Sequence, residues 1–318
     1  MELDFAPMEG VTSCLYRNLH AESFPGVSRY YAPFIAPDGS GRFKGSALRD
    51  ILPENNRDID LVPQVLCNTA EAFLAVSREL GAMGYGEVNL NAGCPSSTVV
   101  PKHKGAGMLS DLESLDNFLA EVFSRCELKV SVKTRMGLNS TAEFPAILKI
   151  YNKYPISELI VHARDRAGMY KSKPDLKAVA ASVPNCRATV SYNGNVVGLA
   201  EYEKLRASVP GLSRMMLGRG AVTDPALFRR IHGGTSLEKD ELRIFLSKLE
   251  AAFLAAGLGE HFTLARLKEL WYYVIWKFPG AEREQKAINK SRTLADYHSA
   301  VSALFASGLY DAEAVFRG

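Results

Sequence analysis

The sequence of 318 residues predicts an α/β fold, a (β/α)₈ TIM barrel followed by an all-helical C-terminal domain. Two observations predict the barrel: eight short apolar runs recur along the chain, and stretches with helical spacing lie between several of them. The runs mostly lack polar alternation, as expected of parallel strands that are buried on both faces. A doubly wound sheet is the alternative arrangement of the same elements. The runs are LDFAPM, SRYYAPFI, LVPQVL, GEVNLNAG, LKVSVKT, ELIVHA, ATVSYNG and SRMMLGRG.

The pattern changes towards the C-terminus, where helical spacing replaces the apolar runs. In the barrel region, helical segments lie between the apolar runs, and residues 70–80 after LVPQVL are an example. After Phe228 the stretch IHGGTS has the composition of a linker, and apolar residues repeat at helical spacing over 242–249. Because single cores stop growing near 250 to 300 residues, two domains are expected. We expect a barrel domain over residues 1–234 and a helical domain over residues 235–318.

The composition is that of an ordinary globular protein, with 47% hydrophobic and 23% charged residues, and it argues against disorder. The N-terminal stretch MELDFAPMEGVTS lacks a basic start followed by an apolar segment. No window reaches the roughly 18 apolar residues of a membrane span. We therefore expect a cytoplasmic protein. The five cysteines are an odd number without the paired spacing of a zinc site, so we expect free thiols and no metal.

The net charge of +3 is too small to indicate a partner, but basic residues are concentrated locally. Residues 261–292 hold seven basic and three acidic side chains. This excess could attract a phosphate backbone, although a solvated helix face gives the same pattern.

Polar and glycine residues gather at the C-terminal ends of the apolar runs. In TIM barrels these strand ends and the loops after them build the active site. The residues concerned are Met8 and Glu9, Gln64, Asn89 and Asn91, Lys133 and Arg135, His162 and Arg164, Asn193 to Asn195, and Gly218 to Gly220. We expect their side chains to converge on one mouth of the barrel.

The longest of these loops carries a thiol. In GEVNLNAGCPSSTVVPKHKGAGML, a strand ending in Asn89 and Asn91 leads directly to Cys94. At the barrel mouth this thiol could reach a substrate that lies over the centre. The alternative is that Cys94 packs under the loop, because free cysteine is often buried.

Two cations follow the next run. Lys133 and Arg135 would be costly at the end of a buried strand without a counter-charge. A ligand with negative charge would supply it, and a salt bridge to a barrel carboxylate is the alternative. His162 occupies a similar position, where a lone histidine is usually structural.

The last two strand ends, SYNGNV and MLGRGA, carry glycines. In TIM barrels this pair of loops frequently forms a phosphate site with the N-terminus of a short helix. Gly194, Gly218 and Gly220 allow close approach of the backbone, and Arg219 adds charge and hydrogen-bond donors. We therefore expect a cofactor that bears a phosphate.

Taken together, these residues resemble the tRNA-dihydrouridine synthase family. The matching segments are FAPMEGVT, VPQVL, VNLNAGCPS followed by KGAGML, VSVKTRMG, IVHARDR, YNGN and MLGRGA, in this order. The segment ARLKELWYYV also resembles the helical tRNA-binding region of the family, most closely in the subgroup that modifies D-loop position 16. RYYAPFIAPDGS lacks the basic residue typical of that subgroup, so the target position stays open.

The resemblance implies an FMN-binding barrel, tRNA as substrate, NADPH as reductant and Cys94 as general acid. It implies FMN contacts from Pro7, Met8, Glu9, Gln64, Lys133, His162, Asn193, Gly194, Asn195, Gly218 and Arg219. It implies tRNA contacts from Asn91, Arg135, Arg164, Tyr170, Arg266, Lys268 and Tyr273. We expect a monomer.

In the implied chemistry, a flavin hydride attacks C6 of uracil while the Cys94 thiol protonates C5. An unperturbed thiol, with a pKa of about 8.5, stays mostly protonated near neutrality, which suits an acid. The target base must leave the tRNA stack at a cost of a few kcal/mol.

Two alternatives remain from the sequence. One is an FMN-dependent oxidoreductase for a small molecule, of the dihydroorotate or dihydropyrimidine dehydrogenase type. The basic helical C-terminal region argues against it, because a small substrate would not need such a region. The other is a tRNA-binding factor without catalytic turnover.

Overall fold

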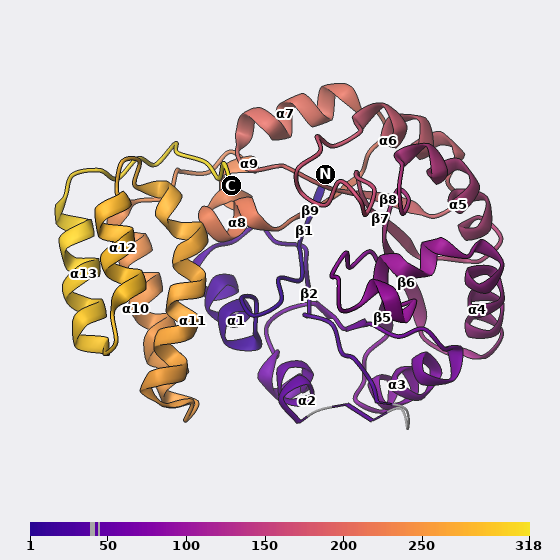
Figure 1. Cartoon of the computed structure of the whole chain (residues 1–318), viewed down its shortest axis with the longest axis horizontal. Coiled ribbons are helices and arrows are strands. Elements are labelled where there is room, and N and C mark those ends of the chain that lie inside the picture. The colour runs from indigo at the N-terminus through magenta and orange to yellow at the C-terminus, as the bar shows by residue number, and fades with distance from the viewer. Residues whose placement is uncertain (39–41, 44) are drawn as a thin grey trace. The chain divides into compact units, whose positions relative to one another are not determined.

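A computed structural model describes residues 1–38, 42–43 and 45–318 of the chain (Figure 1). Its centre is one parallel sheet with the strand order β3-β2-β1-β9-β8-β7-β6-β5-β4. The strands are β1 (Glu2–Phe5), β2 (Arg29–Tyr31), β3 (Leu61–Val62), β4 (Gln64–Val65), β5 (Glu87–Ala92), β6 (Lys129–Arg135), β7 (Glu158–His162), β8 (Thr189–Asn193) and β9 (Arg214–Leu217). All eight apolar runs contribute strands, as predicted. Gly39 and Ser40 at the end of RYYAPFIAPDGS lie outside the described residues.

Strands β3 and β4 are two parts of one barrel strand, interrupted at Pro63. Proline has no N–H to donate, so a regular ladder cannot continue through it. β3 pairs with β2, and β4 pairs with β5. The Pro63 carbonyl still accepts a hydrogen bond from the Asn89 N–H at 2.9 Å. Because the two edges of the sheet meet in this one strand, the sheet closes as a barrel, and the doubly wound alternative is wrong.

Alternation along the strands decides which side chains fill the barrel. Ala6, Tyr31, Val62, Ile160 and Met216 form one buried cluster in the interior. Neighbours two positions away on each strand face the same side. The interior therefore also receives polar side chains near both ends of the strands.

A charged cluster lies near the amino-terminal ends of the strands. Arg29 is within 3.1 Å of Asp4 and 3.4 Å of Glu87, and it also pairs with Glu158. Arg214 adds a second cation at 3.4 Å from Asp4. Burial, opposed by Arg29, raises the pKa of Asp4 to about 7. This end of a TIM barrel generally serves stability, and the cluster fills it.

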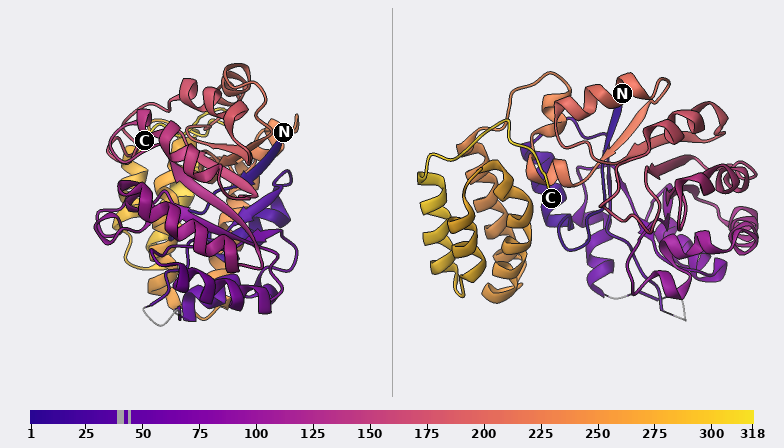
Figure 2. Two further views of the ribbon diagram at one scale, coloured as in Figure 1. Left: turned by 90° about the vertical axis from the view of Figure 1, so that its right-hand side faces the viewer. Right: turned by 45° about the horizontal axis from the view of Figure 1, so that its top comes forward.

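The helices between residues 45 and 182 cover the outside of the strands (Figures 1 and 2). Thr69 caps α3 by accepting a hydrogen bond from the Ala72 N–H, and Asp111 caps α4 in the same way. The helical segment predicted at residues 70–80 is confirmed. The helices are α1 (Cys14–Ser23), α2 (Gly45–Ile51), α3 (Ala70–Ala82), α4 (Leu112–Arg125), α5 (Phe144–Tyr151), α6 (Leu176–Ser182), α7 (Leu199–Ser208), α8 (Arg219–Thr223) and α9 (Leu227–Ile231). The 3₁₀ turns are η1 (Pro53–Asn55), η2 (Val100–Lys102), η3 (Gly105–Ser110), η4 (Thr141–Glu143), η5 (Val183–Asn185) and η6 (Ile275–Lys277).

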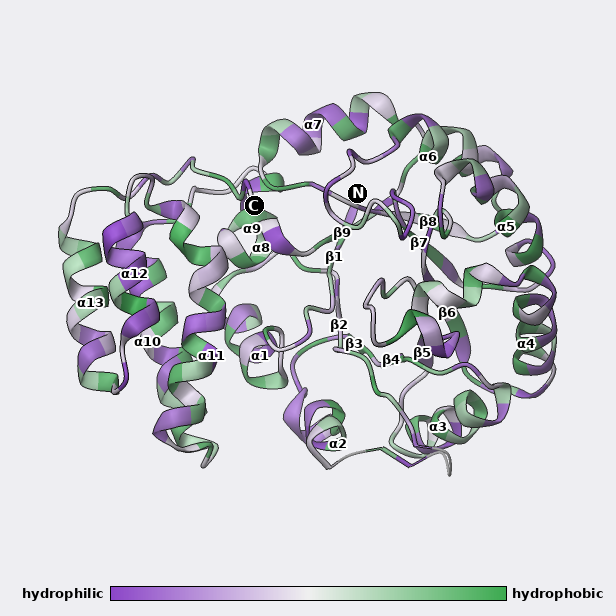
Figure 3. Ribbon diagram, viewed as in Figure 1, coloured by the Kyte–Doolittle hydropathy of each residue, from purple (hydrophilic) through white to green (hydrophobic). Residues whose placement is uncertain are grey.

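The C-terminal segment is helical, as predicted. It comprises α10 (Lys239–Ala255), α11 (Gly259–Val274), α12 (Glu282–Lys290) and α13 (Leu294–Ala306). In the part of the chain that the structure describes, no strand follows Leu217. The Trp271 indole donates a hydrogen bond to the Tyr297 hydroxyl at 2.8 Å in the helical core. Figure 3 colours α12 mostly hydrophilic, and Ile288 is its one buried residue among those described.

Contacts divide the chain into two units. The first comprises residues 1–7, 28–194 and 203–216, and the second comprises 8–27, 195–202 and 217–318. The second unit includes α1 as well as the C-terminal helices. Inside it, the Phe245 ring of α10 packs edge-on against Tyr16 and Phe24 at 5.5 and 5.2 Å. The domain boundary at residue 235 stays a prediction.

A buried ionic group holds the second unit together. The Asp224 carboxylate accepts hydrogen bonds from Lys277 at 2.9 Å and from Arg230 at 2.6 Å. The Lys277 side chain has no exposed surface, and it also donates to the Ala312 carbonyl at 2.7 Å. Two buried cations therefore share one buried carboxylate.

Candidate active site

The polar side chains at the carboxyl ends of the strands in the first unit converge, as predicted. Paired residues of parallel strands carry their side chains on the same face of the sheet. Asn91 pairs with Lys133, and His162 pairs with both Arg135 and Asn193. Lys133 also pairs with Ile160 of the interior cluster, so these side chains share the inner face.

An unbroken chain of amide hydrogen bonds links Asn91 to the middle of the barrel. The Asn91 Nδ2 donates to Gln64 Oε1 at 2.7 Å, and Gln64 Nε2 donates to Asn89 Oδ1 at 2.8 Å. The Asn89 Nδ2 then donates to the Ser131 hydroxyl at 2.9 Å. All four side chains are buried, so their polar atoms require these partners. The chain fixes which way the Asn91 amide points.

The Asn91 side chain in turn holds the backbone of Cys94. Its Oδ1 accepts hydrogen bonds from the N–H groups of Gly93 at 3.1 Å and Cys94 at 2.9 Å. From the other side, Ala106 donates its N–H to the Cys94 carbonyl at 3.0 Å. A Cβ at Gly105 would lie 2.9 Å from the Cys94 Cβ, so the loop packs too closely here for a side chain. Cys94 is a half-buried free thiol on a backbone fixed at both sides.

Lys133 is a half-buried cation at the end of β6. Its pKa is lowered to about 8, first by burial and then by the charge of Arg135, with a smaller opposing influence from Cys94. No carboxylate of the described residues forms an ion pair with it, so the salt-bridge alternative is not observed there. A half-buried ammonium group without a carboxylate partner among the described residues favours a ligand that brings negative charge or hydrogen-bond acceptors.

Arg135 and Arg164 are buried and bonded to loop carbonyls. Arg135 donates to the carbonyl oxygens of Gly93 at 3.0 Å, Asp165 at 2.8 Å and Met169 at 3.0 Å. Burial lowers its pKa. Arg164 donates through Nε to a carbonyl of the same segment, that of Ser172, at 2.6 Å. These arginines hold the loops after β5 and β7, and their contact with tRNA stays a prediction.

Tyr170 presents an aromatic ring in the loop after β7. Its side chain is 51% exposed. The ring lies edge-on to His162 at 5.8 Å, and the Arg135 guanidinium lies 5.5 Å from its centroid. Such a supported ring can stack against a planar group.

Asn193 and Gly194 end the seventh barrel strand. The Asn193 Nδ2 donates to the Met216 carbonyl at 2.9 Å, which ties β8 to β9. A Cβ at Gly194 would lie 2.1 Å from the Tyr192 hydroxyl, so only glycine fits. Burial raises the pKa of Tyr192 to about 12, and the phenol stays neutral.

Asn195, Gly218 and Arg219 form their own arrangement in the second unit. Gly218 is the N-terminal cap of the short helix α8 that the sequence predicts after the last strand. The Arg219 Nη2 donates to Asn195 Oδ1 at 2.6 Å. A Cβ at Gly220 would lie 2.5 Å from the Val196 carbonyl oxygen. The glycine therefore permits close packing against the backbone of Val196, and the approach to a phosphate that the motif predicts stays a prediction.

The turn after β1 contains Met8 and Glu9 and is closed by two hydrogen bonds. The Met8 N–H donates to the Thr12 hydroxyl at 2.9 Å, and the Val11 N–H donates to the Met8 carbonyl at 2.9 Å. Pro7 precedes this turn. Gly10 adopts a φ of 79°, a conformation that favours glycine. A flavin contact for Pro7, Met8 and Glu9 stays a prediction.

The basic residues predicted to bind tRNA have partners within the second unit. Arg266 donates to the Gly10 carbonyl at 3.0 Å, and Lys268 donates to the Ser291 carbonyl. Tyr273 lies 5.8 Å from the Phe316 ring. Lys277, one of the seven basic residues of the local excess, is buried and adds no surface charge. Sequence spacing carries no signal for any of these contacts.

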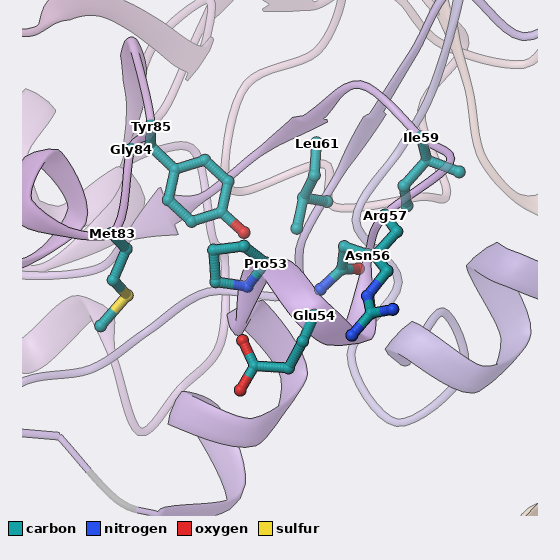
Figure 4. A pocket seen from close by; sticks show the side chains of 9 residues that line it. All are labelled: Pro53, Glu54, Asn56, Arg57, Ile59, Leu61, Met83, Gly84 and Tyr85. Atoms are coloured by element: carbon teal, nitrogen blue, oxygen red, sulfur yellow. The ribbon is translucent and has the colours of Figure 1, made fainter.

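A cavity of about 480 Å³ lies elsewhere in the first unit (Figure 4). Its walls come from η1 and from the segments that enter β3 and β5, so it lies by the amino-terminal ends of strands. That location is opposite to the mouth that carries the candidate site. The lining residues are Pro53, Glu54, Asn56, Arg57, Ile59, Leu61, Met83, Gly84 and Tyr85.

None of the helices in residues 1–38 and 45–318 has the length and apolarity to cross a membrane. The same residues hold no group of three or more side chains suited to a metal ion.

Three comparisons identify relatives of the chain. A tRNA-dihydrouridine(16) synthase of Cupriavidus necator is 26% identical over 321 residues, covering 95% of this chain and 98% of that protein. A probable tRNA-dihydrouridine synthase of Staphylococcus aureus is 28% identical over 275 residues, covering 76% and 80%. Among solved structures, a variant of NCR from Zymomonas mobilis matches with a TM-score of 0.52 at 13% identity, covering 77% and 90%, which shows a shared fold. The family model of dihydrouridine synthases matches residues 4–292, and the chain belongs to this family.

Proposed function

We propose that the chain reduces uridine in tRNA to dihydrouridine, with FMN as its cofactor and NADPH as the reductant. One observation carries the proposal: Cys94 stands on a backbone held by Asn91, near the cation Lys133. A thiol and a cation at the barrel mouth suit the protonation of a substrate carbon next to a bound flavin. Membership of the dihydrouridine synthase family supports the same reaction.

The residues of the chain fit FMN. The Lys133 ammonium suits the oxygen and nitrogen acceptors of the flavin ring, and Gln64 and His162 lie on the same inner face. Gly194 and Gly220 carry no side chain that would keep a phosphate away from the backbone N–H groups. We assign FMN contacts to Pro7, Met8, Glu9, Gln64, Lys133, His162, Asn193, Gly194, Asn195, Gly218 and Arg219. When bound, the flavin supplies the hydride for uracil C6.

The chain itself supplies position and one proton. The Cys94 thiol holds the proton at Sγ and delivers it to C5 of the base. Asn91 holds the Cys94 backbone, so the thiol needs no reorganisation to reach that position. Tyr170 offers a ring on which an extruded base can stack.

We assign tRNA contacts to Asn91, Arg135, Arg164, Tyr170, Arg266, Lys268 and Tyr273. Basic side chains on a helical region favour binding to a phosphate backbone. The chain is proposed to act as a monomer, which light scattering with and without tRNA would test.

The decisive experiment compares Cys94→Ala with Cys126→Ala. Both cysteines are half-buried free thiols, but Cys126 ends α4 on the outside of the barrel. Cys94→Ala should stay yellow, keep FMN and form no dihydrouridine in tRNA. Cys126→Ala should match the wild type. Wild-type activity in Cys94→Ala would refute the proton-donor role.

A second experiment separates this proposal from its alternatives and maps the target. Mass spectrometry of tRNA from cells with and without the gene should show one uridine position that loses its two added hydrogens. Purified protein should oxidise NADPH with tRNA and not with orotate or free uracil. Turnover of the small molecules would favour the alternative enzyme class, and absence of any turnover would favour a non-catalytic binding factor.

A further inference from the structure

The last residues of the chain, 311–318, form an irregular segment, here called the C-terminal strap. The Asp311 N–H donates to the Lys277 carbonyl at 2.9 Å. The Glu313 carboxylate pairs with Arg230 at 2.5 Å, next to the buried Asp224. The first half of the strap is therefore fixed to the buried ionic group of the second unit.

The second half of the strap places one ring among three others. Phe316 is 5% exposed. Its ring centroid lies 6.1 Å from that of Tyr272, 5.8 Å from that of Tyr273 and 5.8 Å from that of Trp276. Because α11 and η6 supply these three rings, the position of Phe316 is set by the helical region.

The strap then contacts Arg219 twice. The Arg219 guanidinium carbon lies 5.1 Å from the centroid of the Phe316 ring, a cation–π contact. Arg219 Nη1 donates to the Gly318 carbonyl at 3.1 Å, while its Nη2 donates to Asn195. A second backbone contact lies beside this one, because a Cβ at Gly198 would stand 2.8 Å from a Val315 methyl group.

We propose that the C-terminal strap positions Arg219 to bind the cofactor phosphate, with Phe316 as the positioning residue. The inference rests on the proposed function, which assigns Arg219 to that phosphate. An arginine side chain can adopt many rotamers, so contacts that already order it lower the entropy lost when it binds a phosphate. A guanidinium has five N–H donors in a planar fork, so it can bind several acceptors at once. Through Arg219, the aromatic cluster should therefore affect binding of the flavin phosphate and not binding of the flavin ring.

This role makes a specific prediction about two flavins. FMN carries the phosphate and riboflavin lacks it, so only FMN affinity should depend on Phe316. The full-length protein, freed of flavin, would be titrated with each flavin by fluorescence quenching. Phe316→Leu should weaken FMN about fivefold, the size of one exposed cation–π contact. Riboflavin affinity should stay unchanged, and Phe316→Tyr should restore FMN binding.

A matched control uses a second arginine and phenylalanine pair. The Arg243 guanidinium carbon lies 5.9 Å from the Phe305 ring, and that ring is 4% exposed. Phe305→Leu makes the same chemical change beside an arginine that is not assigned to the phosphate. It should leave the affinities for both flavins unchanged.

A thermodynamic cycle keeps the test valid if Phe316→Leu also lowers stability. Arg219→Lys should weaken FMN, and adding Phe316→Leu to it should cause little further loss, because the second residue acts through the first. Additive losses of FMN affinity in the double variant would overturn the inference. It would also be overturned if Phe316→Leu lost FMN and riboflavin affinity equally, or if its FMN affinity were unchanged. A wild-type chain that binds no FMN would overturn the cofactor assignment and the inference with it.

Discussion

The Arg266 guanidinium of α11 donates a hydrogen bond to the carbonyl oxygen of Gly10 at 3.0 Å, across 256 positions of sequence. The same guanidinium pairs with Glu269 at 2.6 Å. A residue expected to face tRNA therefore also fixes the turn that follows β1. Changes at Arg266 should consequently affect both flavin and tRNA binding.

Gly10→Ala should destabilise the protein more than Gly257→Ala, although both glycines have a similar positive φ. Gly10 has a φ of 79°, and a Cβ there would lie 3.0 Å from Arg266 Nη1 and 3.2 Å from Glu269 Oε2. Gly257 has a φ of 71°, and a Cβ there would meet no described atom within 4 Å. Gly257→Ala should cost about 1 kcal/mol through its backbone alone. Urea unfolding of both variants measures the difference, and equal midpoints would contradict the contact.

Lys133 should make FMN binding depend on pH. Its pKa of about 8 in the flavin-free protein means that the ammonium is mostly charged at pH 7 and mostly neutral at pH 9. FMN affinity should fall roughly tenfold over this range, because the neutral amine must first take up a proton. Lys133→Arg keeps its charge and should bind FMN with little dependence on pH. A wild-type affinity that is constant from pH 7 to 9 would exclude this role.

Asp224→Asn should strongly destabilise the second unit. The substitution leaves Lys277 and Arg230 buried without their shared carboxylate. Removing one partner of a buried pair costs about 3–5 kcal/mol. Glu22→Gln, which breaks the exposed pair with Lys248, should change stability by less than about 1 kcal/mol. Chemical unfolding of both variants tests the contrast, and similar small losses would show that Asp224 is dispensable.

His20 should make the protein sensitive to acid. Burial lowers its pKa to about 3, and its Nε2 bonds to the Pro225 carbonyl at 2.9 Å. The unfolded chain binds a proton near pH 6.5 and the folded chain only near pH 3. This histidine therefore contributes stability above pH 6.5 that is lost as pH falls, at up to about 1.4 kcal/mol per pH unit.

The test compares the pH dependence of unfolding in two variants. His20→Gln has no titrating group at this position and should flatten the curve between about pH 6.5 and 4. His298→Gln makes the same chemical change at an exposed histidine and serves as the matched control. A wild-type curve without acid loss in this range would disprove the assignment.

The strands could be predicted from sequence because parallel strands buried on both faces require continuous apolar runs. Polar residues appear where each buried strand ends, so they identified the mouth of the barrel. The division of the third strand at Pro63 was not predicted. It arises because the residues before Pro63 pair with β2 and those after it pair with β5, which the sequence does not show. The run LVPQVL looks like one strand in sequence, and it is one strand in the barrel.

The partners of the site residues could not be predicted. The bonds of Arg135 to the carbonyls of Asp165 and Met169 depend on the path of a loop, which no periodicity encodes. Lys277 follows the apolar end of α11, and its sequence position gives no sign that it is buried against Asp224. Contacts of this kind arise from the packing of distant segments, so a local pattern cannot reveal them.

The hydrogen-bonded series from Ser131 through Asn89 and Gln64 to Asn91 links the Cys94 backbone to the barrel interior. Each amide must keep its oxygen and nitrogen in one orientation, since a flip at any member sets two donors or two acceptors against each other. A hydroxyl in the barrel strand that follows Cys94 along the chain therefore helps determine where the sulfur stands. The conformation of this loop therefore depends on side chains of the barrel interior as well as on its own sequence.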